Sequence, residues 1–173
     1  MKIGIDIDDT IVNTKELQIK LWKEYIKNNK NNKYTKDLPS NINEFGDPYI
    51  NAFWDTYREQ LSFSTTIKEG AKEVIKKLQE EGYKLCIITS RPEDKYTNLK
   101  QRIKEHLSKY DIYIDEIITD AKDKGSSMVK NNVDILIDDD IRHINSALKY
   151  NKTAIHLNDS TSWKDIEKHI RNI

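Results

Sequence analysis

The sequence predicts an α/β fold, a doubly wound and mainly parallel sheet with a small helical cap inserted after the first strand. Short β-branched runs alternate with segments of helical periodicity, as is typical of parallel strands buried on both faces and joined by helices. One long stretch before residue 67 interrupts this alternation with helical patterns alone. We therefore expect two parts, an α/β core of residues 1–13 and 67–173 and a small helical cap of residues 14–66.

Five strands are expected, and each is a short apolar run. They cover residues 3–7, 85–88, 117–118, 135–137 and 154–157. Repeated strand–helix–strand units imply right-handed crossovers and therefore a parallel sheet. Because ligands of such sheets bind at the carboxyl ends of the strands, the residues that follow each run are the first candidates for a functional site.

The core helices are predicted from apolar residues that recur on one helical face. These residues are Ala71, Val74, Ile75 and Leu78 in one helix and Leu99, Ile103 and Leu107 in the next. Gly82 supplies a stop for the first helix, since glycine is favoured just after a helix end. Three shorter helices are expected to begin near Asp123, Ile141 and Ser162.

Two helices are expected in the cap. The apolar stripe of the first consists of Leu17, Leu21, Trp22, Tyr25 and Ile26. An Asn/Lys-rich stretch, residues 28–33, follows it as a solvated loop. The second helix begins at Asp47-Pro48 and carries Phe53, Trp54 and Tyr57. The helical spacing of these aromatic residues favours a hydrophobic core for the cap itself, and stacking on a nucleobase is the alternative.

Composition and charge disfavour several classes of partner. The chain has 173 residues, and its 29 basic residues cancel its 29 acidic ones. Since no basic stripe is present, a general nucleic-acid or anionic-membrane binder is disfavoured. We expect no membrane span and no signal peptide, and hence a cytoplasmic protein. Cys86 is the only cysteine, so no internal disulfide is expected, and its place in an apolar run favours a buried side chain over a nucleophile.

Acidic residues gather after two of the predicted strands. The first run ends in Asp6-Ile7-Asp8-Asp9-Thr10 and the fourth in Asp138-Asp139-Asp140. Residues two apart on a strand point to the same side, so Asp6 and Asp8 can converge on one site. Two acidic clusters at one sheet edge repel unless some carboxylates are protonated or a cation lies between them. Oxygen ligands without Cys or His favour Mg²⁺, although each cluster alone is also compatible with a turn or a helix cap.

The motifs at these strand ends resemble those of the haloacid dehalogenase (HAD) superfamily. The segment from Asp6 to Thr10 resembles its first motif, Ile87-Ile88-Thr89-Ser90 its second, and Ile135-Leu136-Ile137-Asp138-Asp139 its fourth. The resemblance covers the whole α/β core and implies a HAD-like, Rossmann-type fold. The small helical insert and the Ile-Asp-Asp strand end resemble the branch of 5′(3′)-deoxyribonucleotidases and bacterial 5′-nucleotidases.

The resemblance assigns a role to each motif residue. Asp6 is the expected nucleophile that forms an aspartyl-phosphate, and Asp8 is the expected general acid and base. Mg²⁺ is expected to be held by Asp6, by Asp138 and by the main-chain carbonyl of Asp8. Thr89 and Ser90 are expected to bind the phosphoryl group. Thr10 and Asp139 are expected to contact these residues and hold them in position, without being direct ligands themselves.

The third motif of the family is a lysine, and the sequence offers three candidates. Lys124, which opens the helix before the Asp138 strand, is the first choice for binding the phosphoryl group. Lys95 resembles a Lys-Tyr pair of the deoxyribonucleotidases and is the second, and Lys122 is the third. Arg91 either touches the substrate or belongs to a plain turn that begins at Arg91-Pro92.

These observations predict a Mg²⁺-dependent phosphomonoesterase. The reaction they favour is that of a nucleotidase acting on nucleoside or deoxynucleoside 5′-monophosphates. The acid at Asp8 favours ester hydrolysis over dehalogenation, because only the ester needs a proton for its leaving alcohol. Phosphatases of other small esters, such as sugar phosphates, are the alternative within the family. A receiver-like signalling module that is phosphorylated on aspartate is the alternative from another class.

Overall fold

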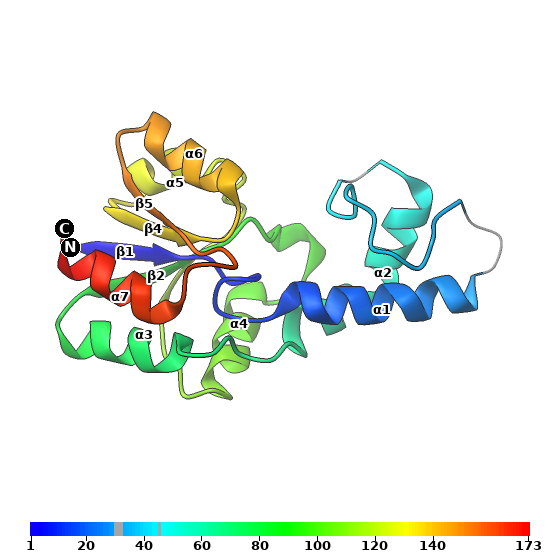
Figure 1. The fold of residues 1–173 in the computed structure, drawn as a ribbon, viewed down its shortest axis with the longest axis horizontal. Coiled ribbons are helices and arrows are strands. Elements are labelled where there is room, and N and C mark those ends of the chain that lie inside the picture. The colour runs from blue at the N-terminus through cyan, green and yellow to red at the C-terminus, as the bar shows by residue number, and fades with distance from the viewer. Residues whose placement is uncertain (30–32, 45) are drawn as a thin grey trace. The chain divides into compact units, whose positions relative to one another are not determined.

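The computed structural model describes residues 1–29, 33–44 and 46–173, and the chain divides into two compact units. The first unit consists of Met1–Val12 and Ile67–Ile173, and the second is Asn13–Thr66. Figure 1 shows the course of the chain through both units. The solvated loop expected at residues 28–33 lies in part outside the described residues.

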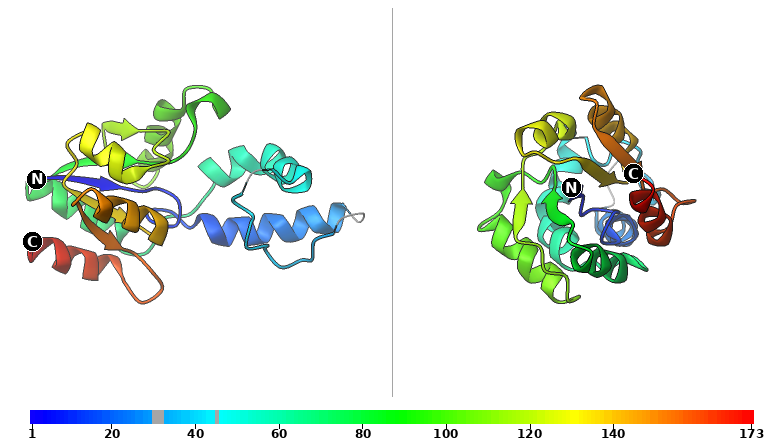
Figure 2. Two further views of the ribbon diagram at one scale, coloured as in Figure 1. Left: turned by 90° about the horizontal axis from the view of Figure 1, so that it is seen from above. Right: turned by 90° about the vertical axis from the view of Figure 1, so that its left-hand side faces the viewer.

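A five-stranded, all-parallel sheet forms the centre of the first unit. Its strands are β1 (Lys2–Ile5), β2 (Lys84–Ile88), β3 (Glu116–Ile118), β4 (Ile135–Asp138) and β5 (Thr153–His156). Their order across the sheet is β3-β2-β1-β4-β5, so the first strand lies in the middle (Figure 2). The predicted doubly wound α/β fold class is therefore confirmed.

The predicted first strand is too long, because the chain leaves the ladder after Asp6. Strand β1 ends at Ile5, although the backbone N–H of Asp6 still donates to the carbonyl of Ile137 at 3.0 Å. The N–H groups of Thr10, Ile11 and Val12 then all point back to the carbonyl of Ile7, at 2.9–3.3 Å. These bonds coil residues 7–12 into a loop and end the strand. The ends of the other four strands lie within one residue of the predicted positions.

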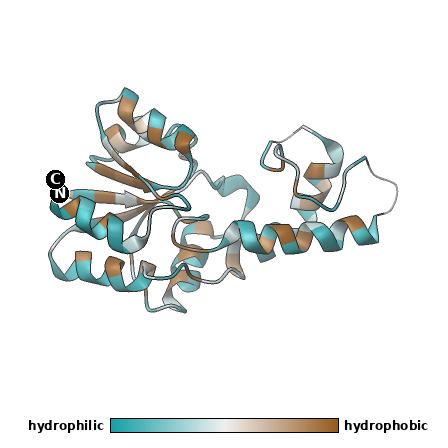
Figure 3. Cartoon of the chain, in the orientation of Figure 1, coloured by the Kyte–Doolittle hydropathy of each residue, from teal (hydrophilic) through white to brown (hydrophobic). Residues whose placement is uncertain are grey.

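Helices cover both faces of the sheet. They are α3 (Ala71–Glu80), α4 (Leu99–Ser108), α5 (Lys124–Lys130), α6 (Ile141–Lys149) and α7 (Trp163–Arg171), with a 3₁₀ turn at Glu93–Lys95. Helices α5 and α6 lie on one face, and α3 and α7 lie on the other (Figure 1). Figure 3 shows that the strands are mainly apolar and that these helices carry their apolar residues on one side. No helix in the described part of the chain is both long and apolar enough to cross a membrane.

The helix boundaries follow the predicted signals. Gly82, which ends the α3 segment, has a φ of +85°, a conformation that glycine adopts without strain. The carboxylate of Asp123 accepts the N–H of Ser126 at 3.1 Å and so caps the N-terminus of α5. Ser162 and Asp165 form a reciprocal capping box at the start of α7. The expected helix starts near residues 123, 141 and 162 are thus confirmed.

The second unit is built around an aromatic core. Helices α1 (Thr14–Asn28) and α2 (Pro48–Phe63) pack on each other, and Asp47 caps α2 as predicted. Trp22 and Phe53 are fully buried, with ring centroids 5.2 Å apart. Tyr25 is also buried, and Trp54 and Tyr57 pack against the same cluster. The interpretation of these aromatic residues as the core of the insert is confirmed.

The polypeptide leaves and re-enters the sheet unit at one point. In the first unit, the N–H of Lys68 donates to the carbonyl of Ile11 at 2.8 Å and closes that unit on itself. In the second unit, the N–H of Asn13 donates to the carbonyl of Thr66 at 2.8 Å. Each unit therefore has its own hydrogen bond between the two connecting segments.

Cys86 lies in the middle of β2 and is fully buried. Burial raises the pKa of its thiol to about 12, so the thiolate is absent near neutral pH. The expectation that this cysteine is a small core residue is confirmed.

Close packing of α5 on α6 depends on Gly125. A Cβ atom at this position would lie 2.4 Å from the backbone oxygen of Ser146 and 2.5 Å from the Tyr150 ring. The absence of a side chain thus lets the start of α5, including Lys124, approach α6.

We expect Gly125→Ala to lower the free energy of unfolding by about 1–3 kcal/mol, the usual cost of overpacking. The added methyl group would push α5 away from the Ser146 backbone, which cannot rotate aside. Urea unfolding measures this change. Ser126→Ala, at the exposed neighbouring position, is the control and is expected to shift the midpoint very little. A Gly125→Ala protein as stable as the wild type would show that α5 moves at no cost.

Candidate active site

A buried cluster of opposite charges lies at the carboxyl ends of β1 and β4. Asp6 and Asp138 are 5% and 0% exposed, and the fully buried ammonium group of Lys124 lies between them. The Nζ atom of Lys124 donates to Oδ1 of Asp6 at 2.5 Å and also to Oδ2 of Asp138. Because β1 and β4 are adjacent parallel strands, residues far apart in the sequence meet here.

Burial and charge act in opposite directions on this cluster. Burial raises the pKa of Asp6 well above its usual value, Asp138 and Asp8 add to the rise, and Lys124 opposes it. Burial lowers the pKa of Lys124, but the two carboxylates outweigh burial and leave the pKa raised, so the ammonium keeps its charge. For Asp138, hydrogen bonds and charges from His143 and Lys124 outweigh burial and lower the pKa.

A third carboxylate joins the cluster from Asp139. One oxygen from each of Asp6, Asp138 and Asp139 lies within 4.8 Å of the others. The Thr10 hydroxyl donates to Oδ1 of Asp139 at 3.2 Å and accepts its N–H at 3.1 Å. Burial, with the charges of Asp138 and Asp9, raises the pKa of Asp139 to about 6.

This donor set fits a small hard cation. Carboxylate oxygens are the ligands that Mg²⁺ prefers, and three of them converge within the described residues without any cysteine. Asp139 was expected to support the metal ligands without being one of them. The structure instead places its side chain among the three converging carboxylates. The side chain of Asp8 is not one of the three.

Asp8 instead contacts Arg91. The guanidinium group donates through Nε to Oδ2 of Asp8 at 2.9 Å and through an Nη to Oδ1 at 2.7 Å. Arg91 is only 7% exposed. Burial lowers its pKa, but the charge and hydrogen bonds of Asp8 outweigh burial and raise it, so Arg91 stays cationic. Sequence reasoning missed this pair, although an arginine directly after the Thr89-Ser90 strand end was a usable signal.

The remaining motif residues lie at the end of β2. Thr89 directly follows β2, the strand beside β1, and is fully buried. Its hydroxyl accepts the N–H of Arg91 at 3.3 Å. Ser90 is exposed and lines a neighbouring pocket. Of the three candidate lysines, the structure brings only Lys124 to the carboxylates of the cluster. Lys95 is exposed with its nearest carboxylate, that of Asp94, at 4.0 Å.

Two histidines border the cluster, and their contacts were missed by sequence reasoning. Nδ1 of His143 lies 3.2 Å from Oδ1 of Asp138, and Nε2 of His156 donates to the carbonyl of Asp139 at 2.8 Å. Helix α6 and strand β5 position these rings. No spacing rule in the sequence indicates either contact, because both depend on the packing of elements that follow Asp138.

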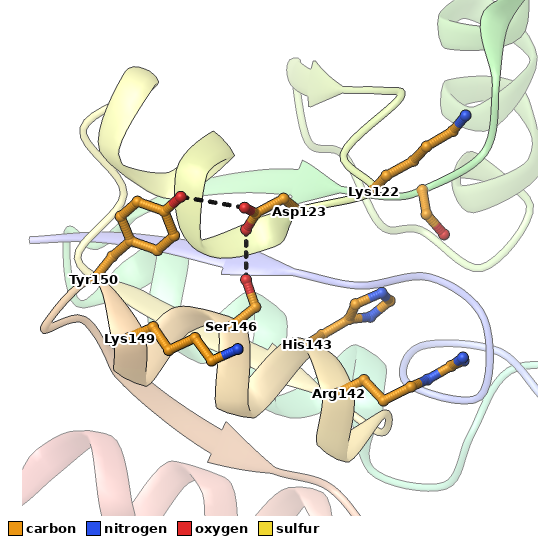
Figure 4. Close-up of a pocket in the computed structure, with 8 residues that line it drawn as sticks. Lys122, Asp123, Arg142, His143, Ser146, Lys149 and Tyr150 are labelled. Atoms are coloured by element: carbon orange, nitrogen blue, oxygen red, sulfur yellow. Dashed lines mark hydrogen bonds between the residues drawn. The ribbon is translucent and has the colours of Figure 1, made fainter.

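A pocket of about 550 Å³ lies beside this cluster within the first unit (Figure 4). Its lining residues are Ser90, Lys122, Asp123, Arg142, His143, Ser146, Lys149 and Tyr150. They come from the end of β2, the loop before α5 and one side of α6.

Comparison with known proteins agrees with the fold and motifs. The family model of haloacid dehalogenase-like hydrolases matches residues 3–156. No curated protein matches the sequence significantly. A solved structure of a predicted phosphatase from Clostridium acetobutylicum is 18% identical, with a TM-score of 0.71 over 99% of this chain and 98% of that chain.

Two further solved structures share the fold at lower identity. A predicted phosphoglycolate phosphatase from Haemophilus somnus 129PT is 13% identical, with a TM-score of 0.64 over 97% of this chain and 96% of that chain. A hydrolase from Streptococcus pneumoniae TIGR4 is 13% identical, with a TM-score of 0.63 over 99% and 98%. The architecture is thus found in several bacterial proteins.

We expect Lys124→Met to lower the free energy of unfolding by about 3–5 kcal/mol, because it leaves two buried carboxylates without their cation. Lys95→Met is the matched control and is expected to change stability by less than about 0.5 kcal/mol, since Lys95 is exposed. Chemical denaturation of both variants gives the comparison. Equal stability of the two variants would contradict the assigned role of the buried ammonium group.

Proposed function

Because the chain belongs to the haloacid dehalogenase-like hydrolases, we propose that it hydrolyses small phosphate monoesters through an aspartyl-phosphate on Asp6. The placement of Asp6 supports this proposal most directly. Its carboxylate lies at the end of the central strand, paired with a buried ammonium group and next to two further carboxylates. A metaphosphate-like group transferred to Asp6 would lie next to the positive charge of Lys124.

In the first proposed step, an oxygen of Asp6 attacks phosphorus in line, and the bond from phosphorus to the alcohol oxygen breaks. Asp8 gives a proton to the leaving oxygen. In the second step, Asp8 takes a proton from water while that water attacks phosphorus and releases Asp6. Lys124 and Thr89 donate to the phosphoryl oxygens, where negative charge must be stabilised.

Asp6, Asp138 and the main-chain carbonyl of Asp8 are the proposed ligands of Mg²⁺, with the Asp139 carboxylate close by. When bound, the ion would neutralise charge on the phosphoryl oxygens and on the crowded carboxylates. The converging oxygen donors of Asp6, Asp138 and Asp139 support this assignment.

The proposed substrates are nucleoside or deoxynucleoside 5′-monophosphates, in the cytoplasm. This narrower proposal rests on the resemblance of the Ile-Asp-Asp strand end, residues 137–139, and of the helical insert to the nucleotidase branch. Residues 14–66 are proposed to act as the cap that selects the alcohol part. Other small esters are the alternative, and one relative of the same fold is described as a predicted phosphoglycolate phosphatase. The family match gives no support to a receiver-like signalling module.

We expect Asp6→Asn to lower the rate of phosphate release at least 10³-fold, roughly the scale at which a covalent nucleophile acts, because the amide cannot form the acyl phosphate. Chelation of Mg²⁺ is expected to abolish release from the wild type, and added Mg²⁺ to restore it. The assay is phosphate release from a panel of nucleotides, sugar phosphates and p-nitrophenyl phosphate, with mass spectrometry of the acid-quenched protein to find phosphate on Asp6.

Asp159→Asn, at an exposed position, is the control and is expected to match the wild type. An Asp6→Asn protein with the wild-type rate would refute the nucleophile. A preference for sugar phosphates over nucleotides would change the proposed substrate class and leave the proposed mechanism unchanged.

A further inference from the structure

We propose that the pocket beside the active site binds a second anionic group of the substrate. The preferred substrates would then be phosphate monoesters whose alcohol part carries a carboxylate or another phosphate. The inference rests on the proposed hydrolysis of phosphate monoesters, and it places such esters ahead of plain nucleoside 5′-monophosphates, which carry no second anion. All residues that line the pocket belong to the first unit.

The position of the pocket lets it receive the alcohol part of a bound ester. Ser90 in its lining directly follows Thr89, a proposed phosphoryl ligand. His143, also in the lining, lies 3.2 Å from Oδ1 of Asp138. The pocket therefore begins where the carboxylate cluster ends and continues along α6 toward Lys149 (Figure 4).

The charge of the lining selects for an anion. Three cationic side chains line the pocket, those of Lys122, Arg142 and Lys149, against one carboxylate, that of Asp123. Arg142 already contacts Asp140. The ammonium groups of Lys122 and Lys149 have no hydrogen-bond or ion-pair partner in the described ranges 1–29, 33–44 and 46–173. An anion entering this space gains attraction from these two ammonium groups, which no carboxylate of the described residues pairs with.

The single carboxylate of the lining, that of Asp123, offsets only part of this attraction, because the lining holds these two ammonium groups against it. Hydrogen bonds hold this carboxylate in the wall of the pocket. Asp123 accepts hydrogen bonds from the Ser146 hydroxyl at 2.5 Å and from the Tyr150 hydroxyl at 3.2 Å. It also accepts the N–H of Ser126 at 3.1 Å. Figure 4 shows the first two of these bonds, which join the loop before α5 to α6.

The test compares matched pairs of substrates that differ by one anion. The carboxylate arm uses 2-phosphoglycolate against 2-hydroxyethyl phosphate, and the phosphate arm uses a nucleoside 3′,5′-bisphosphate against the 5′-monophosphate. For the wild type, kcat/KM is expected to be at least about tenfold higher for the anionic member of one pair, and the pair that shows it identifies the anion. Lys149→Gln and Lys122→Gln are expected to lower this ratio at least about threefold each.

Lys130→Gln, on the exposed side of α5 and outside the pocket, is the matched control and is expected to keep the wild-type ratio. High salt should lower the ratio in the wild type, because the attraction is screened. Turnover of all substrates without a preference for either anionic member would overturn the inference and leave the proposed function standing. Absence of turnover on every substrate would overturn the proposed function itself.

We also propose that Arg91 is a positioning residue for Asp8. Its guanidinium group holds both oxygens of Asp8, at 2.9 and 2.7 Å, in a two-pronged contact that admits one carboxylate orientation. The backbone of Arg91 is fixed at both ends. Its N–H donates to the Thr89 hydroxyl at 3.3 Å, and its carbonyl accepts the N–H of Asp120 at 3.1 Å.

Asp8 needs such a partner because of where it lies. It belongs to the loop after β1, next to Asp9 with a φ of +53°, and its side chain is 37% exposed. Arg91 therefore holds the ionised form of Asp8 near the end of β2, and one oxygen of Asp8 must leave this contact to carry a proton. Loss of this positioning should lower the rate most for substrates whose leaving oxygen needs a proton from Asp8, because the second step is common to all substrates.

The test is a double-mutant cycle of Arg91→Met and Asp8→Asn, read on an alkyl phosphate and on p-nitrophenyl phosphate. The p-nitrophenolate leaves without a proton, and both esters share the second step, so the kcat/KM ratio of alkyl to aryl ester reports on proton transfer to the leaving oxygen. Arg91→Met is expected to lower this ratio about 10- to 100-fold. In the Asp8→Asn background, Arg91→Met should change the ratio less than about twofold.

An unchanged ratio in Arg91→Met, or equal effects in both backgrounds, would overturn the inference. If Arg91→Met does not fold, Arg91→Lys replaces it, since lysine keeps the charge and loses the two-pronged contact. Its ratio is expected to lie between those of the wild type and Asp8→Asn, and a wild-type ratio would overturn the inference equally.

Discussion

The sheet edge at the ends of β1 and β4 depends on one set of contacts, in which the ammonium group of Lys124 lies between two carboxylates. Asp6 and Asp138 end neighbouring strands and are both buried, so without a cation they would repel each other at short range. A buried ion pair is stable only when its geometry satisfies both partners. Here, the position of the lysine is set by the Asp123 cap and by the small size of Gly125, which together fix the first turn of α5.

The order of the strands explains why this cation comes from a crossover. Strand β1 is followed by β2 and β3 on one side, and the chain then crosses to β4 on the other side. The crossing segment carries α5, whose first residue is Lys124. In open α/β sheets, the point where the chain changes direction is where the loops part and ligands bind. The same topology therefore supplies the opening, the two acidic strand ends and the charge that keeps them together.

The sequence was sufficient for the fold class and for most element boundaries, because strand runs, caps and helical stripes are local signals. It indicated the acidic motifs for the same reason. The end of the first strand was wrong, since three N–H groups that bind the Ile7 carbonyl form a loop that no periodicity reveals. The contacts of Asp8 with Arg91 and of Asp138 with His143 join separate elements, and only their packing determines them. Which of the three candidate lysines contacts the carboxylates likewise depends on packing, and Lys124 is the one that is buried among them.

The paired connection at residues 12–13 and 66–67 makes the helical unit a module. Within the sheet unit the N–H of Lys68 donates to the carbonyl of Ile11, and within the insert the N–H of Asn13 donates to the carbonyl of Thr66, so each unit has its own closing hydrogen bond. A segment whose two junctions lie side by side can be exchanged there without any change to the strand order or the acidic residues. Evolution, or a protein engineer, can thus replace residues 13–66 at this joint and leave the sheet unit intact.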